Sequence, residues 1–573
     1  MLSAENQRWL DEFRAKYGRA PRILHIGNIA NNAYLNAKIL TVAGIDCDVL
    51  CYDYYHVMGC PEWEDADFLG SIDEQNHPDW TMVDLKGFRR PAWFAQGPFE
   101  ICIDYLTARR ANNSRAERKY WRQLSQANKT LAVSKSGKRV WTFVSKLVNR
   151  FFIIAVDKDP LPRVVARLAS LNNYKFPIGH LVATAAIMGT LLFSFVCKFA
   201  LLPYFFFRRF LALSSYKVAH QKTDGSYTTP TLSDWVVHWN FIFHQCFPNR
   251  TDSLLTEDIV GYYDSLPKYR KLLSYYDVVH GYASDGIFAL FSQTTYVAYE
   301  HGTIRSLPFQ ESTLGRLCAI TYKLADHVCI TNADNVTAAV ALALKRFSFI
   351  PHPINEGPIL KATESPDTYK KLHRELDSDF LVFHPARQHW DAQRHPNWEK
   401  GNDIFIKGFS RFVKEVNHRA KAIFVEWGNT VDASRALIKE LDISDNIVWI
   451  QPQNTAGMAM YISSTDLLAD QFFLGAFGST LPRALASAKP AMLYLNVALH
   501  EWCFEEMPPI INAGNDSEVF YGLTVAYRDK DWINDLAVRG HQWYQRYHSN
   551  EVIGDRLFSV YQSVLENRNA PIG

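Results

Sequence analysis

The chain has 573 residues, more than one ordinary hydrophobic core accommodates, so two or more domains are expected. Its composition, 48% hydrophobic and 21% charged, is that of a globular protein and excludes an intrinsically disordered chain. The net charge of +2 conceals an asymmetry: residues 109–222 contain 21 Lys and Arg but 3 Asp and Glu, whereas the rest of the chain holds 40 basic and 56 acidic residues. A basic module is therefore inserted in an acidic protein.

The first twenty residues are charged and helical in pattern, without the apolar stretch of a secretory signal. We therefore expect the protein to stay in the cytoplasm. The nine cysteines are scattered and form no Cys-x-x-Cys pair, so we expect free thiols and no zinc site.

Residues 21–52 predict a strand, a loop, a helix and a second strand. The first apolar run ends at Gly27 and the helical pattern ends at Gly44. A glycine that closes the first strand before a helix is typical of a doubly wound parallel domain. The Asp-x-Asp pattern within Glu64–Asp67 has no suitable strand beside it. We interpret this segment as a solvated acidic loop and assign no metal.

Residues of about 110–250 interrupt the first sheet and contain the basic module. Within them, 181–207 is strongly apolar, and its first 17 residues carry no charge, close to the ~20 that span a bilayer. A single crossing would divide the first sheet between two sides of a membrane, so a helical hairpin or an interfacial helix pair is expected. The basic flanks favour contact of residues 175–215 with the cytoplasmic leaflet. The alternatives are a buried hairpin that covers the sheet and, less favoured, a nucleic-acid surface.

Short β-rich segments separated by helical ones recur in the rest of the chain, which predicts an α/β fold with two Rossmann-like domains facing across a cleft. The N-terminal domain is expected over 1–355, with the basic, hydrophobic helical insertion inside it. The C-terminal domain is expected over 356–540, and a helix over 541–573, beginning near Asp531, is expected to pack back across both domains. The strands are predicted within 276–282, 294–302, 324–332, 346–354, 379–387, 421–428, 446–452, 465–472 and 489–495.

Arg387 follows the first strand of the second domain, and Lys400 and Gly401 directly precede a helical pattern. Arg, Lys and the amino end of a helix are the groups that neutralise a diphosphate in a site without metal. These residues are therefore candidate phosphate ligands.

The motifs resemble those of family-4-type, group 1 glycosyltransferases of the GT-B fold, over about 20–110 and 255–560. The segments that carry the resemblance include 276–282, 300–303, 325–336, 351–355, 422–429 and 465–493. The resemblance implies that Arg387 and Lys400 hold the diphosphate of a nucleotide-sugar donor. It also implies that His301 faces the transferred sugar, that no metal or other cofactor is required, and that the loop with Gly27, Asn28 and Asn31 lies on the acceptor side.

The chain departs from this family at the usual Glu-x7-Glu pair, where Gly475 and Arg483 stand instead. Backbone N–H groups of the turn formed by Gly475, Ala476, Phe477 and Gly478 are candidate donor ligands. Arg483 is a candidate partner of a phosphate or an acidic sugar. Asp470, before the turn, is the candidate replacement carboxylate.

The leading hypothesis is a retaining glycosyltransferase that uses a nucleotide sugar at the inner face of the cell membrane. Its acceptor would be a lipid-linked saccharide or another glycan of surface polysaccharide or glycoconjugate biosynthesis. The alternative is a catalytically silent membrane scaffold of the same fold that partners an active transferase. A nucleotide-sugar epimerase is a third possibility, but it has no need of a lipid-facing insertion.

Overall fold

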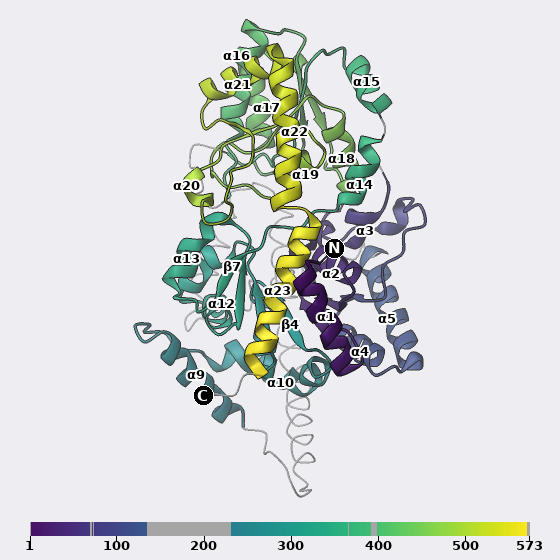
Figure 1. Ribbon diagram of the computed structural model, residues 1–573, viewed down its shortest axis with the longest axis vertical. Helices are drawn as coiled ribbons and strands as arrows, with labels where there is room; N and C mark the ends of the chain where they lie inside the picture. Colours follow the sequence, from purple (N-terminus) through teal and green to yellow (C-terminus); the bar gives the residue numbers. More distant parts are fainter. Residues whose placement is uncertain are drawn as a thin grey trace, which may run out of the picture. The chain divides into compact units, whose positions relative to one another are not determined.

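Parallel strands form two separate sheets (Figure 1). The computed structural model describes residues 2–68, 72, 74–133, 231–364, 366–390 and 398–569. The first sheet has the order β3-β2-β1-β4-β5-β6-β7, and the second has the order β10-β9-β8-β11-β12-β13. The strands of the first sheet are β1 (Arg22–Ile26), β2 (Asp46–Tyr52), β3 (Phe94–Gly97), β4 (Val278–Tyr282), β5 (Tyr296–Tyr299), β6 (His327–Ile330) and β7 (Phe347–Phe349). Those of the second are β8 (Leu381–His384), β9 (Lys421–Val425), β10 (Ile447–Ile450), β11 (Leu467–Ala469), β12 (Ala491–Leu493) and β13 (Ile511–Asn512).

Both sheets reverse their strand order once, between β1 and β4 in the first and between β8 and β11 in the second. This is the order of doubly wound Rossmann folds, which bind ligands beyond the carboxyl ends of the strands at the point of reversal. The prediction of two Rossmann-like α/β domains is confirmed.

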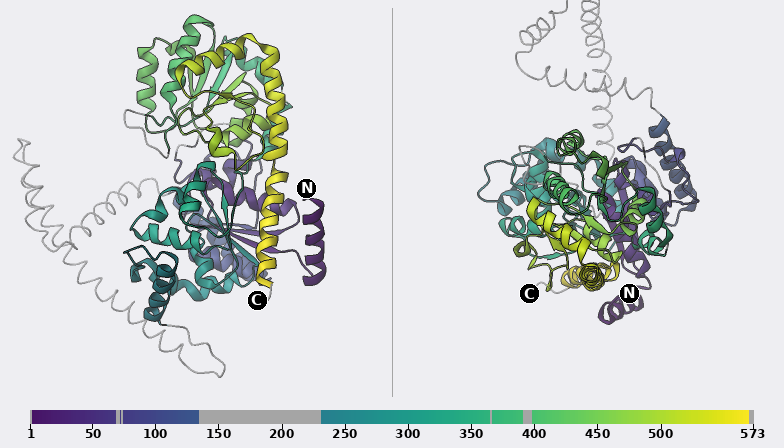
Figure 2. Two further views of the ribbon diagram at one scale, coloured as in Figure 1. Left: turned by 60° about the vertical axis from the view of Figure 1, so that its left-hand side comes forward. Right: turned by 90° about the horizontal axis from the view of Figure 1, so that it is seen from above.

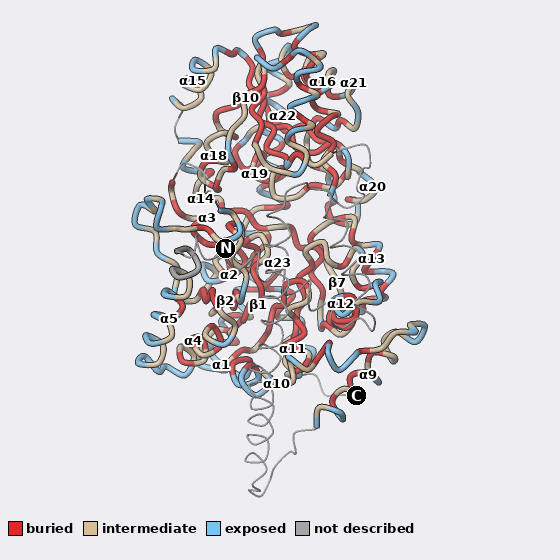
Figure 3. The backbone as a smooth tube through the Cα atoms, turned by 180° about the vertical axis from the view of Figure 1, so that it is seen from behind, coloured by how far each residue is buried: buried red, intermediate tan, exposed pale blue. Residues whose placement is uncertain are grey.

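Helices cover both faces of the first sheet, and its strands are almost wholly buried (Figure 3). Alternate side chains of β1 point to opposite faces: Leu24 and Ile26 enter one apolar core and Ile23 the other. One face carries α1 (Ala4–Tyr17), α2 (Asn32–Val42) and α23 (Asn550–Asn569). The other carries α4 (Phe99–Arg110), α5 (Ser114–Val133), α9 (Leu232–Cys246), α10 (Thr256–Leu273), α11 (Ile287–Ser292), α12 (Thr313–Lys323) and α13 (Val336–Ala341).

The second sheet is covered in the same way. The short helix α3 (Pro61–Asp65), from the N-terminal part of the chain, contacts α18 beside this sheet. The helices of the second half are α14 (Glu356–Thr363), α15 (Pro366–Glu375), α16 (Asn402–Glu415), α17 (Val431–Glu440), α18 (Thr455–Ser463), α19 (Thr480–Ala486), α20 (Val497–His500), α21 (Asp516–Arg528) and α22 (Lys530–Tyr547).

The predicted C-terminal helix is two helices, α22 and α23, and this corrects the expectation of a single one. The break falls at His548, whose φ of −137° is not helical and whose Nε2 lies 2.9 Å from the carbonyl oxygen of His352. Trp543 and Tyr544 of α22 pack in a core of the second sheet, whereas Leu557 and Phe558 of α23 pack in a core of the first. The two helices follow one another along both sheets (Figure 2). The end of the chain therefore joins both sheets.

The predicted strands are all present, and β3 and β13 are additional to them. The eight described cysteines are free thiols, as expected. The predicted membrane contact at 175–215, and most of the insertion of about 110–250, lie outside the described residues. The described parts of the insertion are α5 at its start and α9 at its end.

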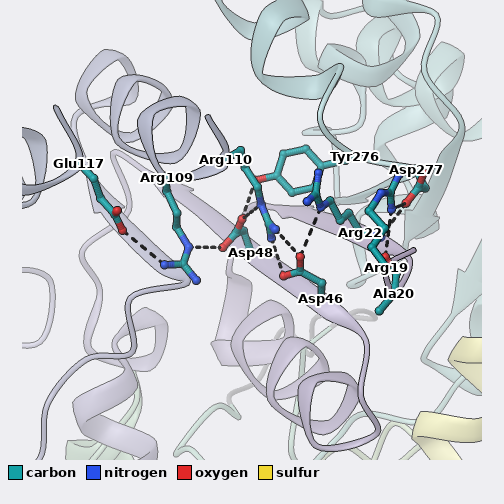
Figure 4. Close-up of polar contacts among 10 residues, drawn as sticks. All are labelled: Arg19, Ala20, Arg22, Asp46, Asp48, Arg109, Arg110, Glu117, Tyr276 and Asp277. Atoms are coloured by element: carbon teal, nitrogen blue, oxygen red, sulfur yellow. Dashed lines mark hydrogen bonds and ion pairs between the residues drawn. The ribbon is translucent and has the colours of Figure 1, made fainter. Parts of the chain in front are cut away.

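A network of charged side chains fixes the end of α4, from which α5 continues (Figure 4). Asp48 of β2 is fully buried and accepts from Arg109 Nε at 3.2 Å and Arg110 Nε at 2.5 Å. Tyr276 Oη donates to the same carboxylate at 2.7 Å, and Asp46 binds the other edge of Arg110. Burial raises the pKa of Asp48, and the two guanidinium groups oppose this shift. The carboxylate of Asp48 therefore ties both arginines at the end of α4 to β2 of the sheet.

Candidate active site

A cavity of about 860 Å³ lies beyond the carboxyl ends of both sheets. Its volume is in the range of about 300–1,000 Å³ that is usual for small-molecule sites. Residues that follow β1, β2, β5, β6 and β7 line it from the first sheet, and residues that follow β8, β9, β10 and β11 line it from the second. Of the candidate residues from the sequence, the cavity brings together His301, Arg387, Lys400, Asp470, Gly478 and Arg483.

Arg387 lies just after β8, at the reversal point of the second sheet. The backbone beside it is fixed, because Gln388 N donates to Trp427 O at 2.7 Å. The guanidinium lies over the Trp427 ring at 4.2 Å, and its Nη2 is 3.4 Å from Met58 Sδ. Gly428 allows the backbone after β9 to lie close to the backbone of Gln388. Its φ is +129°, and a Cβ there would lie 2.3 Å from Gln388 O.

Lys400 is held at the amino end of α16. Its backbone N donates to His389 O at 2.8 Å, and its carbonyl accepts from Phe472 N at 2.8 Å. Its Nζ donates to Gln471 Oε1 at 3.2 Å. Gly401 is the N-cap residue, with a φ of +67° that favours glycine, and it does not line the cavity. Gly401 therefore positions Lys400 and the helix.

The cavity carries positive charge that the described residues do not neutralise by ion pairing. Arg305 also lines it but pairs with Asp334 at 2.7 Å, whereas neither Arg387 nor Lys400 forms a salt bridge with any described residue. Burial lowers the pKa of both Arg387 and Lys400. Asp470 is 6% exposed, and burial raises its pKa to about 6 while the charge of Lys400 opposes the shift. The arrangement is suited to a ligand with negative charge.

His301 reaches the cavity from the loop after β5, and Asn32 determines its tautomer. Asn32 Nδ2 donates to Ile29 O at 3.1 Å, which identifies this atom as the amide nitrogen, and lies 3.1 Å from His301 Nδ1. Asn32 Oδ1 accepts from His352 Nδ1 at 3.3 Å. Because His301 Nδ1 accepts, the ring proton is on Nε2. Burial lowers the pKa of His301 to about 4, so the ring is neutral and offers an N–H donor.

The three residues predicted for the acceptor-side loop, Gly27, Asn28 and Asn31, do not line the cavity. Asn28 and Asn31 are buried, and their side chains hold the carbonyl groups of Gly59 and Cys60 at 2.9 and 3.0 Å. Gly27 has a φ of +90°, and a Cβ there would lie 2.4 Å from Asp285 Oδ2. The cavity is lined instead by Ala30 and Asn32 of the same loop and helix start.

The turn around Phe477 contributes only in part. Gly475, Ala476 and Phe477 do not line the cavity, whereas Gly478 does. Phe477 is 8% exposed and stacks on His500, with ring centroids 5.3 Å apart. Gly475, at a φ of +70°, accepts from Asn496 N at 2.9 Å, so its role in the structure is to bring residues 475 and 496 together.

The segment Glu64–Asp67 is not the solvated acidic loop that the sequence predicts. Glu64 is 5% exposed, lines the cavity and accepts from Thr455 Oγ1 at 2.7 Å. Asp65 accepts from Lys38 at 2.6 Å and from Asn355 at 2.7 Å. The prediction was wrong because these partners are distant in sequence and the charges alone do not reveal them. Asn32, Trp427 and Glu64 are thus site residues that the sequence analysis missed. The cluster of asparagines after β1 was the available signal for Asn32.

Among the described residues, no group of three or more His, Cys, Asp or Glu side chains has the arrangement of a metal site. In the same part of the chain, none of the helices combines the length and apolarity needed to cross a membrane.

No family model matches the sequence, and no curated protein matches it. Several solved structures are similar in fold. HepE of Anabaena, in complex with UDP and glucose, is 16% identical, with a TM-score of 0.42 over 52% of this chain and 82% of that chain. Sucrose-phosphate synthase of Thermosynechococcus elongatus is 14% identical, with a TM-score of 0.40 over 54% and 80%. A glycosyltransferase of Rickettsia africae is 13% identical, with a TM-score of 0.40 over 61% and 85%.

Proposed function

We propose that the protein is a glycosyltransferase that moves a sugar from a nucleotide-sugar donor to an acceptor. The observation that carries this proposal is the pair Arg387 and Lys400, which line the cavity at the reversal point of the second sheet without a salt bridge to any described residue. The nucleotide is the leaving group of a nucleotide sugar, and its growing negative charge needs cations already in place. Arg387 supplies a planar donor pair for one phosphate, and Lys400 supplies a point charge beside the amino end of α16.

The other groups of the cavity suit the sugar. His301 donates through Nε2 to a sugar hydroxyl, and Asn32, itself held by His352, keeps the His301 ring in place. Asp470, ionised above pH of about 6, accepts from a second hydroxyl and attracts the positive charge that develops on the sugar ring. The bond from the anomeric carbon to the phosphate oxygen breaks, a bond to the acceptor oxygen forms, and the proton of the acceptor hydroxyl passes to the released phosphate. We propose that the configuration is retained, as the family resemblance implies.

The test is the rate of sugar transfer, measured as nucleotide release from an identified donor. Arg387→Ala and Lys400→Ala are each expected to lower kcat/KM by about 10²-fold or more, since each removes a charge-assisted contact to the leaving group. Lys414→Ala, on an exposed position of α16, is the matched control and is expected to change the rate by less than about two-fold. Full transfer by the first two variants would contradict the proposal.

We further propose that no metal ion is needed, because Arg387 and Lys400 take the part of a divalent cation at the leaving group. Addition of EDTA is expected to leave the transfer rate unchanged. Loss of the rate in EDTA and its recovery with Mg²⁺ or Mn²⁺ would contradict this.

The acceptor is proposed to be a lipid-linked saccharide or another glycan at the inner face of the cell membrane. The support comes from the sequence of residues 175–215 and from the two described helices that flank the insertion. Exposed basic residues lie on α5, and α9 exposes Val237 by 66% and Phe241 by 64%. Both helices pack on the same face of the first sheet. The exposed basic residues of α5 are Arg115, Arg118, Lys119 and Arg122.

Deletion of residues 175–215 is expected to move the protein from the membrane fraction to the soluble fraction. Binding of the nucleotide sugar should be kept, because the cavity lies in the described part of the chain. A deletion variant that still sediments with anionic vesicles would contradict the assignment of this segment.

A further inference from the structure

Glu64 lines the cavity from the N-terminal domain, whereas Arg387 and Lys400 line it from the C-terminal domain. It belongs to α3, which precedes β3 of the first sheet, whereas the two cations follow β8 of the second. Glu64 Oε2 accepts from Thr455 Oγ1 of α18 at 2.7 Å and lies 3.9 Å from Arg483 Nη2 of α19. A buried carboxylate from one domain is therefore held by two residues of the other.

The second oxygen of Glu64 is left for a ligand. Oε1 forms no hydrogen bond with a described residue and is not shut off from solvent, although the residue as a whole is 5% exposed. The neighbouring Asp65 differs, because Tyr34, Lys38 and Asn355 all donate to its carboxylate. Asn355 Nδ2 also donates to Glu64 O at 2.6 Å. The backbone under Glu64 is thus fixed, and one carboxylate oxygen remains available in the cavity.

The chemistry of this oxygen restricts what it binds. An ionised carboxylate only accepts hydrogen bonds and repels phosphate, so a phosphate group would lie toward Arg387 and Lys400. Arg483 Nη2 lies 3.9 Å from Glu64 Oε2, and Arg483 Nε is itself buried without a partner among the described residues. A hydroxyl group suits both, because it donates to Glu64 and accepts from a neighbouring N–H.

We propose that Glu64 binds hydroxyl groups of the nucleotide-sugar donor, so that both domains contact the donor at the same time. This inference rests on the proposed function, since it concerns the same donor. The hydroxyls belong either to the ribose or to the transferred sugar, and a carboxylate binds both in the same way. Glu64 is then a specificity-determining residue that the first domain contributes to the donor site.

The experiment is isothermal titration of the full chain and its Glu64→Gln variant. Glutamine keeps an acceptor for Thr455 but loses the charge. The probe is the tightest binder among UDP-glucose, GDP-mannose and ADP-glucose, followed by its free nucleoside diphosphate and the 2′-deoxy form of that diphosphate. We expect Glu64→Gln to raise the Kd of the nucleotide sugar by about ten-fold to a hundred-fold. Glu64→Asp, which keeps the charge, should recover part of the affinity.

The matched control is Asp67→Asn in the same segment. Asp67 pairs with Lys361, its side chain is 45% exposed, and it does not line the cavity. We expect the Kd of the nucleotide sugar for the Asp67→Asn variant to stay within about two-fold of the wild-type value. If Glu64 binds the ribose, the substitution weakens binding of the free diphosphate as much as binding of the nucleotide sugar. Binding of the 2′-deoxy diphosphate is then less affected by the substitution. If it binds the transferred sugar, only the nucleotide sugar is weakened.

Two results separate failure of this inference from failure of the proposed function. If Glu64→Gln lowers the melting temperature but leaves every Kd unchanged, while Arg387→Ala abolishes binding, Glu64 only joins the domains and the inference is overturned. If the wild-type protein binds none of the probes, the proposed function fails, and this inference fails with it.

Discussion

His301 is a neutral hydrogen-bond donor across the physiological pH range. Its pKa is lowered to about 4 by burial, and its Nδ1 is occupied by Asn32. We predict that His301→Ala lowers kcat by about 10²-fold to 10³-fold, because a donor to the sugar is lost. The pH profile of kcat/KM should show no step from His301 between about 5 and 8. A step near pH 6.5 that vanishes in His301→Ala would instead identify the ring as a proton shuttle.

Asp470 should set the acid limb of activity. Burial raises its pKa to about 6, so the carboxylate is ionised at neutral pH and becomes protonated as the pH falls through about 6. We predict that kcat/KM of the wild type declines below that pH, and that Asp470→Asn is slow but has no such step. The measurement is a pair of pH–rate profiles. A variant that keeps the wild-type decline would assign the step to another group.

Single residues of the site were predictable where local chemistry decides their role. Arg387 and Lys400 follow a strand and precede a helix, and both line the cavity. Asn28 and Phe477 have equally suggestive positions in the sequence, but tertiary contacts use them elsewhere: Asn28 holds Gly59, and Phe477 stacks in a core. The burial of Glu64 is not predictable from the sequence around it, because its partner Thr455 is 391 positions away.

Among the elements, α23 is the one that fastens the end of the chain to the first sheet. Phe558 is 1% exposed and meets Trp9 of α1 edge to face, with ring centroids 5.5 Å apart. We predict that Phe558→Ala lowers the free energy of unfolding by about 3–5 kcal/mol, the usual cost of removing a buried aromatic ring. Val538→Ala on α22, at 54% exposure, should cost less than about 0.5 kcal/mol. Urea titrations measure both, and equal values would contradict the buried role of α23.

The elements that the sequence predicts best are long or strongly apolar. β1, β4 and β8 are apolar runs that end beside glycine or proline, and all three lie in the interior of their sheets. β3 reads Phe-Ala-Gln-Gly, without the apolar run of the predicted strands, and β13 has only two residues; both lie at sheet edges. The break between α22 and α23 has no proline or glycine to announce it. It depends on the contact of His548 with His352 from another part of the chain.

The whole molecule should lose stability in mild acid. Burial lowers the pKa of His25 to about 3 and of His384 and His548 to about 4, while the unfolded chain titrates near 6.5. On these histidines the unfolded state therefore binds more protons between pH of about 6.5 and 4, and the stability that they contribute above 6.5 declines over that interval. We predict that the melting temperature falls steadily across it. A melting temperature that is constant from pH 7 to 4.5 would contradict the neutral state of these rings.

The cavity that the two domains share is proposed to bind a nucleotide sugar through Arg387 and Lys400. Isothermal titration of the wild-type protein and of the double variant Arg387→Ala, Lys400→Ala with UDP-, GDP-, ADP- and CMP-sugars tests it most directly. We predict that the wild type binds one of these donors and that the double variant binds it at least about 10²-fold more weakly. Failure of the wild type to bind any of them would contradict the claim and favour a catalytically silent scaffold. Equal binding by the double variant would place the phosphates elsewhere.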